Sequence, residues 1–369
     1  MNGWRETTLG EACELYQPKT ISSAELIDGG AYPVYGANGV IGRFDKFNHA
    51  DSQLLITCRG ATCGSVNISQ PNSWINGNAM VVKPRDTSVE LNYLKHLFKG
   101  GLDLTTVITG AAQPQITRQS LAPLKVSFPS SIEQRRIAAI LDQADALRTK
   151  RREALVQLDS LTKSIFIEMF GDPMTNPMGW NCKPFSEIGK VVTGNTPSRE
   201  VPDYYGNAIE WIKSDNINTP HYYLTKATEG LSNSGKAVGR TVPPFSILVT
   251  CIAGSPECIG NAAMTDREVA FNQQINAFVP ISVDPHFIYA QILIGKKLIQ
   301  EASTNGMKGM VSKSRFEKIM LMEPDLALQK KFAIRAQAIE ALKASHVVSL
   351  TKLDALFDSL QHRAFQGEL

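Results

Sequence analysis

The chain has 369 residues, of which 43% are hydrophobic and 20% charged, with a formal net charge of +3 and an isoelectric point near 8.4. This length suits about two globular domains, and no apolar run is long enough for a membrane-spanning helix. The first six residues lack the features of a secretory signal, so we expect a cytoplasmic protein. The small positive charge permits nucleic-acid binding without arguing for it.

The first block of the chain has the pattern of a mixed, strand-rich domain. Residues 52–58, 79–82 and 124–128 are rich in β-branched and apolar side chains and predict strands. Residues 90–99 predict a helix, as do residues 285–299 in the second half. Loops containing glycine and asparagine separate these elements, and such loops on a rigid framework commonly carry recognition residues.

A long helix is expected to follow each block. Pro129 precedes Ser130 and Glu133, which form a capping-box pattern, and Asp325 occupies the corresponding N-cap position later in the chain. Apolar residues then recur in alternating steps of three and four, as in the seam of a coiled coil. This stripe consists of Leu155, Leu158, Thr162, Ile165 and Met169 in the first helix, and of Leu350, Leu353, Phe357, Leu360 and Ala364 in the second.

These helices belong to an internal repeat. A constant shift of 195 residues relates Pro129 to Pro324, Gln134 to Gln329 and Phe170 to Phe365, without a gap over more than fifty residues. An exposed apolar stripe needs a partner, and the simplest partner is the other copy of the repeat. The middle of the helix has diverged between the copies, since residues 148–152 correspond to the less basic 343–347, which makes symmetric use of this stretch doubtful.

The expected fold is therefore α+β, with a pseudo-two-fold internal repeat and two mixed, strand-rich domains separated by a two-helix antiparallel coiled coil. We expect the first domain at 1–129, a long helix at 130–171, a linker and second domain at 172–324, and a second long helix at 325–369.

At this point the chain resembles the specificity subunits of Type I restriction-modification systems, the HsdS family, over essentially its whole length. The stretches that carry the resemblance are YPVYGANGVIG at 32–42, VTGNTPS at 192–198, FNQQINA at 271–277 and AFQGEL at 364–369. The resemblance implies two target-recognition domains that each read one half of a bipartite sequence in double-stranded DNA. It also implies a spacer role for the helices, two docked DNA-methyltransferase (HsdM-type) subunits, and an added restriction and translocation (HsdR-type) subunit.

Patterns that would indicate an enzyme are incomplete. The nearest match to an amino-methyltransferase loop, residues 242–245, begins with Val242 where a polar residue is required. The phosphate-loop pattern at 230–237 ends in Ala237, which cannot bind magnesium, so a surface loop bearing Lys236 is the better interpretation. We expect no catalytic residue and no cofactor. A nucleotide-dependent enzyme built on this loop and a coiled-coil protein-interaction scaffold without DNA readout are the alternatives.

Metal binding is not expected either. No cysteine pair has C-x-x-C spacing and no histidine lies at a zinc-ligand distance in sequence. In a reducing compartment these cysteines are expected to be small buried residues. They are Cys13, Cys58, Cys63, Cys182, Cys251 and Cys258.

Candidate DNA contacts are polar residues in loops, because arginine suits guanine, asparagine and glutamine suit adenine, and lysine suits phosphates. In the first block they are Tyr35, Asn38, Arg43, Arg59, Gln113, Gln115 and Arg118. In the second block they are Lys213, Asp215, Asn216, Lys236, Arg240, Lys308 and Lys313. An exposed side chain without a ligand is the alternative for each. The amides of 272–274 are interpreted as buried groups that satisfy the backbone.

The densest basic run lies on the first helix, at Arg148, Lys150, Arg151 and Arg152. A solvated flank of the coiled coil is the default interpretation. Docking onto an acidic partner and phosphate contact across the unread spacer are the alternatives.

Overall fold

The structure, a computed structural model of the chain, describes residues 3–110, 113–219, 221–304 and 309–369. The chain divides into two compact units: unit 1 consists of Met1–Arg152 with Val348–Leu369, and unit 2 of Glu153–Val347. The two long helices are α4, Ser131–Phe170, and α10, Leu326–Gln366. Each helix thus contributes one part to unit 1 and the other part to unit 2.

Unit 1 combines small sheets with short helices. Its strands are β1 Arg5–Thr8, β2 Cys13–Tyr16, β3 Tyr32–Gly36, β4 Gly39–Phe44, β5 Leu54–Thr57, β6 Val66–Ile68, β7 Trp74–Ile75, β8 Ala79–Pro84 and β9 Lys125–Phe128. Its short α-helices are α1 Leu9–Ala12, α2 Leu91–His96 and α3 Arg118–Leu121. The strands form a sheet of order β2-β8-β5-β6, a smaller sheet of order β4-β3-β7, and the pair β1-β9.

Unit 2 repeats this plan with a larger second sheet. Its strands are β10 Cys182–Pro184, β11 Gly189–Thr193, β12 Tyr205–Ile212, β13 Gly230–Leu231, β14 Thr241–Val242, β15 Ile247–Thr250, β16 Ile252–Ala253, β17 Ala262–Met264, β18 Val269–Phe271, β19 Ile275–Pro280, β20 Gly309–Met310 and β21 Met320–Met322. Its short helices are α5 Phe185–Ile188, α6 Asn233–Val238, α7 Pro285–Ile294, α8 Lys296–Glu301 and α9 Lys313–Phe316. The sheet orders are β11-β19-β15-β17, β13-β12-β18-β14, β16-β20 and β10-β21.

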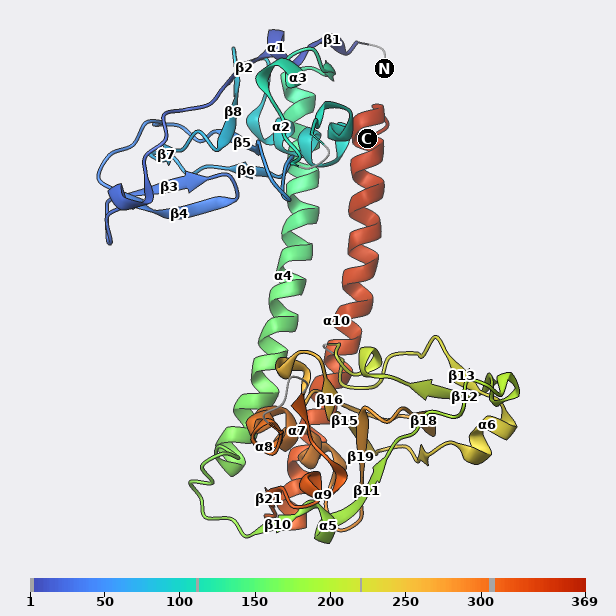
Figure 1. Cartoon of the computed structure of the whole chain (residues 1–369). Coiled ribbons are helices and arrows are strands. Elements are labelled where there is room, and N and C mark those ends of the chain that lie inside the picture. The colour runs from blue at the N-terminus through green and yellow to red at the C-terminus, as the bar shows by residue number, and fades with distance from the viewer. Residues whose placement is uncertain (1–2, 111–112, 220, 305–308) are drawn as a thin grey trace. The chain divides into compact units, whose positions relative to one another are not determined.

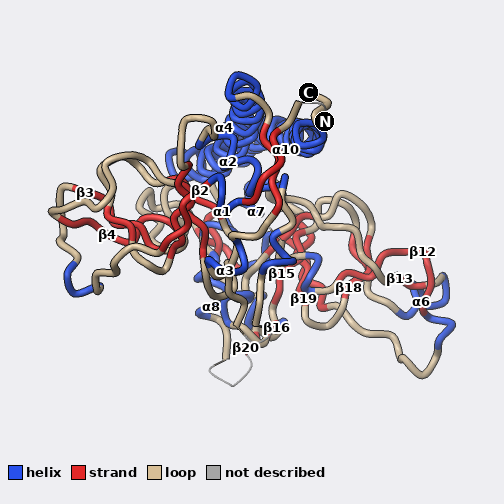
Figure 2. The backbone as a smooth tube through the Cα atoms, turned by 90° about the horizontal axis from the view of Figure 1, so that it is seen from above, coloured by secondary structure: helices blue, strands red, loops and turns tan. Residues whose placement is uncertain are grey.

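In each unit we call the sheet that contains β2 or β11 the first sheet, and the sheet that contains β3 or β12 the second sheet. The first sheet lies between the long helices and the second sheet. Figures 1 and 2 show β3 and β4 of unit 1, and β12 and β13 of unit 2, on the side away from α4 and α10. Each second sheet contains one short parallel pairing, β3 with β7 in unit 1 and β12 with β18 in unit 2. Both units thus share one layered architecture, as expected from the repeat.

The long helices enter the hydrophobic core of both units. In unit 1, Leu141 of α4 and Phe357 of α10 belong to the same buried cluster. In unit 2, Phe166 of α4 packs edge-on against Phe332 of α10, with ring centroids 5.4 Å apart. In each unit the start of one helix packs near the end of the other, so the antiparallel pairing is confirmed.

The expected coiled-coil stripe is confirmed by burial. All ten residues of the stripe are buried or half-buried, whereas neighbours on the same helices are exposed, including Val156 at 66% and Leu356 at 51%. None of the helices in the described part of the chain is long and apolar enough to cross a membrane. Of the six cysteines, Cys13, Cys58 and Cys251 are buried, and the other three are half-buried.

The repeat extends to individual hydrogen bonds. In unit 1 the side chain of Gln134, fully buried, accepts from the backbone N–H of Glu90 at 2.9 Å and donates to the carbonyl of Pro129 at 2.9 Å. In unit 2 the side chain of Gln329 accepts from the backbone of Asp284 at 2.9 Å and donates to Pro324 at 2.7 Å. A glutamine near the start of each long helix therefore fastens that helix to its unit.

Three local expectations need correction. The helix expected over 285–299 is broken, because Gly295 caps α7 and α8 starts after it. The helix expected over 90–99 is α-helical only to His96 and continues as a π-helix, Leu97–Gly101. The surface loop expected around Lys236 is instead the strand β13 followed by helix α6, with Lys236 inside that helix.

Candidate nucleic-acid interface

In unit 1 two loops are joined by hydrogen bonds to Asn38. This residue lies in the turn between β3 and β4, and its Oδ1 accepts a hydrogen bond from the Thr62 hydroxyl at 2.8 Å. The Thr57 hydroxyl, at the end of β5, lies 3.1 Å from the same oxygen. The turn after β3 and the loop after β5 therefore form one polar surface, and Asn38 is exposed on it.

The segment that ends in Gln115 completes this surface. Arg59 and Gln115 form an antiparallel bridge, and the N–H of Ile116 donates to the carbonyl of Cys58 at 2.9 Å. Arg59 is exposed, and its side chain forms no hydrogen bond with any residue that the structure describes. The fold thus brings together three of the seven candidates of the first block, Asn38, Arg59 and Gln115, and the exposed Gln113 lies two residues before Gln115.

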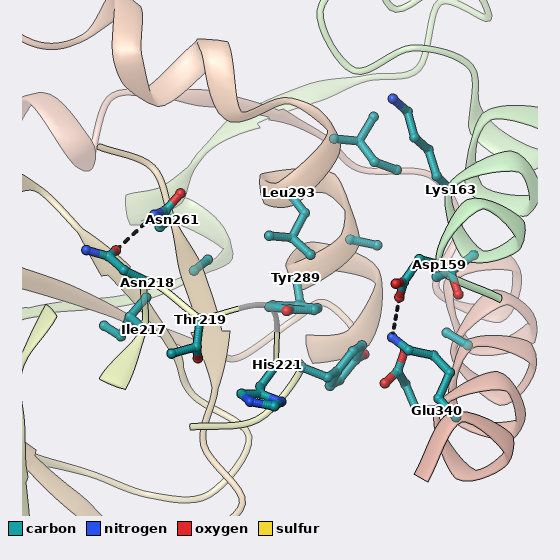
Figure 3. Close-up of a pocket in the computed structure, with 17 residues that line it drawn as sticks. Asp159, Lys163, Ile217, Asn218, Thr219, His221, Asn261, Tyr289, Leu293 and Glu340 are labelled. Atoms are coloured by element: carbon teal, nitrogen blue, oxygen red, sulfur yellow. Dashed lines mark hydrogen bonds and ion pairs between the residues drawn. The ribbon is translucent and has the colours of Figure 1, made fainter. Parts of the chain in front are cut away.

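Unit 2 contains an equivalent arrangement around Asn218. The Nδ2 of Asn261 donates to Asn218 Oδ1 at 2.9 Å, and the Thr250 hydroxyl lies 3.3 Å from the same oxygen. The ammonium of Lys296 can only donate, and it contacts Asn261 Oδ1, so this contact orients both amides. Figure 3 shows Asn218 and Asn261 bonded at one side of a pocket.

The two arrangements share a backbone and differ in side chains. The bridge of Arg59 with Gln115 corresponds to the pairing of Ile252 in β16 with Met310 in β20. The bond of Ile116 to Cys58 is repeated between the N–H of Val311 and the carbonyl of Cys251, at 2.8 Å. One scaffold therefore presents a charged and an amide side chain in unit 1, and two apolar side chains in unit 2.

The pocket beside Asn218 is a cavity of about 600 Å³ in unit 2, between α7 and the long helices. Its charged lining is largely paired, because Lys343 contacts Asp159 at 2.6 Å and Glu340 at 2.9 Å. Tyr289 and Leu293 of α7 supply apolar wall. No group of metal-binding side chains occurs among the residues that the structure describes.

Two candidates from the sequence are buried, which removes them from the surface. Tyr35 is 6% exposed in the core beneath the second sheet, and its hydroxyl accepts from the N–H of Gln70 at 3.1 Å. Asn216 is 7% exposed, and its Oδ1 accepts from the backbone N–H of Lys213 at 3.1 Å. Both side chains satisfy polar groups of the protein itself.

The remaining candidates of unit 1 either lie apart from the Asn38 surface or form hydrogen bonds within the unit. Arg43 is exposed, but its guanidinium donates to the carbonyls of Gly30 and Ala31. Arg118 is exposed as the first residue of α3 and lines a different pocket, together with Arg85.

In unit 2 most of the candidate cations have acidic partners. Lys213 contacts Glu229 at 2.6 Å, Lys236 contacts Glu268 at 2.7 Å, and Lys313 contacts Glu317 at 3.5 Å. Asp215 and Arg240 are exposed. Lys308 lies outside the described residues.

The interpretation of the amides at 272–274 is confirmed for Asn272, which is 6% exposed and accepts from the N–H of Gln274 at 3.1 Å. It is wrong for Gln273, which is exposed and accepts from the Thr196 hydroxyl.

Two residues of the basic run on α4 form ion pairs with α10. Arg148 and Arg152 both contact Asp354 of α10, at 2.5 and 2.8 Å. Lys150 is exposed and Arg151 is half-buried. The divergence of this stretch between the two copies made its symmetric use doubtful, but one position is used symmetrically. Lys343 corresponds to Arg148 in the repeat, and it contacts Asp159, which corresponds to Asp354.

Sequence reasoning missed two residues. Asn218 lies two residues after Asn216, and only the contact with Asn261 distinguishes it. Arg199 directly follows the 192–198 stretch, and its guanidinium lies over the rings of Tyr205 and Trp211, which follow it closely in sequence. A basic residue close to several aromatic residues was the available signal.

Comparison with known proteins gives one consistent family. The family model described as "Type I restriction modification DNA specificity domain" matches residues 1–157 and again 177–346. The specificity subunit of the Type I restriction enzyme HindI from Haemophilus influenzae is 27% identical over 199 residues, which are 52% of this chain and 42% of that protein. The specificity subunit of the Escherichia coli enzyme EcoprrI is 30% identical over 147 residues, 39% of this chain and 36% of that protein.

Solved structures show the same fold. The S subunit of a Type I restriction-modification system from M. genitalium matches with a TM-score of 0.68 and 16% identity, over 98% of this chain and 96% of that one. A structure described as showing complex assembly and conformational transition of the Type I system matches with a TM-score of 0.57 and 15% identity, over 100% and 99% of the two chains. The matches to the curated relatives span less than half of each relative's length.

Proposed function

The chain belongs to the family of Type I restriction modification DNA specificity domains, and on that premise we propose that it selects the DNA target of a Type I restriction-modification complex. Unit 1 reads one half of a bipartite sequence and unit 2 reads the other half. The chain performs no catalytic step itself, and it needs no cofactor. Because its ligand is chromosomal DNA, it acts in the cytoplasm.

The observation that carries this proposal is the pair of equivalent loop surfaces with different side chains. The surfaces around Asn38 and Asn218 have the same hydrogen-bonded framework, whereas Arg59 and Gln115 are replaced by Ile252 and Met310. Hydrogen-bonding side chains and apolar side chains contact different features of the major groove. Two half-sites of different sequence are therefore expected.

The long helices act as spacer and as docking surface. The bases between the half-sites are crossed without readout, and the number of these bases follows from helix length. Exposed apolar residues on the helices, such as Val156, Val347 and Leu356, suit the docking of two methyltransferase subunits. A restriction and translocation subunit joins this assembly.

Partners are needed for tight DNA binding. The net charge of the chain is only +3, and Lys213, Lys236 and Arg148 are already paired with acidic side chains. Each such pair neutralises a cation that could otherwise contact a phosphate, and phosphate contacts supply most nonspecific affinity. The isolated chain should therefore bind DNA weakly, and the assembled complex should bind it specifically.

Mapping methylated bases by genome sequencing tests this proposal. Cells that carry the chain with its methyltransferase partner should show one interrupted motif, and cells with the methyltransferase alone should lack it. An uninterrupted motif, or an unchanged pattern when the chain is removed, would contradict the proposal.

A further inference from the structure

Unit 2 contains an arginine held over two aromatic rings. The guanidinium of Arg199 lies 4.2 Å from the ring centroid of Tyr205 and 5.3 Å from that of Trp211. The Arg199 side chain is 56% exposed, whereas Trp211 is buried. The rings form a fixed platform, because Trp211 Nε1 donates to the carbonyl of Asn195 at 3.2 Å and Tyr205 donates to that of Pro197 at 2.6 Å.

The carboxylate of Glu229 restricts rotation of this guanidinium in its plane. Arg199 Nη2 donates to Glu229 at 2.7 Å, and Lys213 contacts the other oxygen of Glu229 at 2.6 Å. The hydrogen bonds from Lys213 and Arg199 lower the pKa of the Glu229 carboxyl below its ordinary value. Glu229 therefore stays ionised at neutral pH and holds the plane and direction of Arg199.

The other donors of Arg199 have no acceptor within the described residues, since Nη2 to Glu229 is its one hydrogen bond there. Arg267 in the same unit differs, because its guanidinium donates to Glu210, to Asp266 and to the carbonyl of Thr225. Arg199 thus combines a fixed plane with an unoccupied, solvent-facing edge, whereas Arg267 is used within the fold.

We propose that Arg199 contacts a guanine in the half-site read by unit 2, donating two hydrogen bonds to O6 and N7 from its unoccupied edge. Planar, bidentate donation is the contact by which arginine distinguishes guanine from the other bases. Tyr205 and Glu229 are positioning residues, because they touch Arg199 and not the base. This inference rests on the proposed function and adds to it one base and one residue.

Pre-orientation favours base reading over phosphate contact. A phosphate can be approached from many directions, so a flexible lysine serves equally well, whereas a base edge demands one plane. Ordering a free arginine on binding costs conformational entropy, and the platform has already ordered Arg199 in the free protein.

The experiment uses the complete chain with its methyltransferase partner, and methylated bases are mapped for the wild type, Arg199→Ala and Arg199→Lys. In the wild type, the half-site read by unit 2 should contain a G·C pair. Both variants should accept other pairs at that position and leave the other half-site unchanged. Binding of purified complexes to the original duplex should weaken about ten- to hundredfold for Arg199→Ala. Arg199→Lys keeps the charge, so its relaxed motif shows that the fork is required.

Glu229→Gln tests the positioning role against Glu200→Gln, a matched loss of charge at a neighbouring exposed residue. Glu229→Gln should relax the same G·C position partially, and Glu200→Gln should not. Unchanged motifs in both Arg199 variants would overturn the guanine contact while the interrupted wild-type motif upholds the proposed function. Uniform weakening over all sequences would assign Arg199 to a phosphate and also overturn it. A wild-type complex that marks no interrupted motif would remove the proposed function, and this inference with it.

Discussion

Arg148 of α4 contacts Asp354 of α10 at 2.5 Å within unit 1, and 195 residues later in the repeat Lys343 contacts Asp159 at 2.6 Å within unit 2. The same ion pair is thus made twice, each time between the two long helices. Arg148 also lies 4.2 Å from the ring centroid of Phe357 and is only 16% exposed. Its role is to join the helices.

Replacement of Arg148 by alanine should destabilise unit 1. The variant loses a charge-assisted hydrogen bond and a cation–π contact, which together should lower the free energy of unfolding by about 1–3 kcal/mol. Lys150→Ala, at an exposed position of the same helix, should change it by less than about 0.5 kcal/mol. Urea unfolding measures both, and equal effects would show that the Arg148 pair contributes no more than an ordinary surface charge.

The buried glutamines offer a second test of the repeat. Gln134→Ala should leave the N–H of Glu90 and the carbonyl of Ser88 without their partner, and each unsatisfied group costs about 1–3 kcal/mol. Gln329→Ala should act likewise in unit 2, through Asp284 and Pro324. Thermal unfolding should show both losses, whereas Gln157→Ala on the exposed face of α4 should be neutral. A neutral Gln134→Ala would mean that the helix start is not fastened in this way.

Stability should fall as the pH drops below about 6.5. His96 is fully buried, and burial lowers its pKa despite the hydrogen bond of its Nε2 to Asp142 at 2.8 Å. Because the unfolded chain protonates at the ordinary histidine pKa and the folded chain only at a lower pH, stability is complete above about 6.5 and is lost below it.

His96→Gln should reduce this loss when chemical unfolding is compared at pH 7.5 and 5.5. Some dependence should remain, since burial also lowers the pKa of His49 and His286. An identical pH dependence in the variant and the wild type would rule out a contribution of His96.

In unit 1, Arg59 on the proposed reading surface can be compared with Arg43, an exposed arginine outside that surface. Arg59→Ala should weaken binding of the assembled complex to its target by about tenfold or more and relax one position of one half-site. Arg43→Ala should leave the motif unchanged, because Arg43 binds carbonyls of its own unit. Binding titrations and methylation mapping would decide, and a relaxed motif in Arg43→Ala alone would reverse the assignment.

If the long helices act as a spacer, shortening them should shorten the unread spacer between the two half-sites. Deleting residues 149–155 and their counterparts 344–350 removes one heptad from each helix, about 10 Å at 1.5 Å per residue. The unread spacer of the methylated motif should shorten by about three base pairs, and both half-sites should stay the same. An unchanged spacer would show that helix length does not determine the spacing.

The long helices could be predicted from their local periodicity, and the repeat from a constant shift of 195 residues between matching positions. Gln134 and Gln329 share one position in the repeat, and burial of the 3.5-residue stripe follows from its spacing. The second sheets could not be predicted, since the parallel pairing of Trp211 with Ala270 joins residues far apart in sequence. Tyr35 was misassigned because both faces of β3 are covered, so the strand shows no polar alternation.

The base-reading residues were the least predictable part of the site. Residue type alone cannot distinguish Arg43, used within its unit, from Arg59, whose side chain has no bond in the described part of unit 1. Nor can it show that Arg199 lies over Tyr205 and Trp211. These distinctions depend on tertiary contacts.

The independence of the two units as readers is tested most directly by exchanging residues 1–128 for the corresponding domain of another specificity subunit and mapping methylated bases. One half of the motif should change to that of the donor, while the other half and the number of unread bases stay as in the parent. If both halves change together, or neither does, target selection is not divided between the two units.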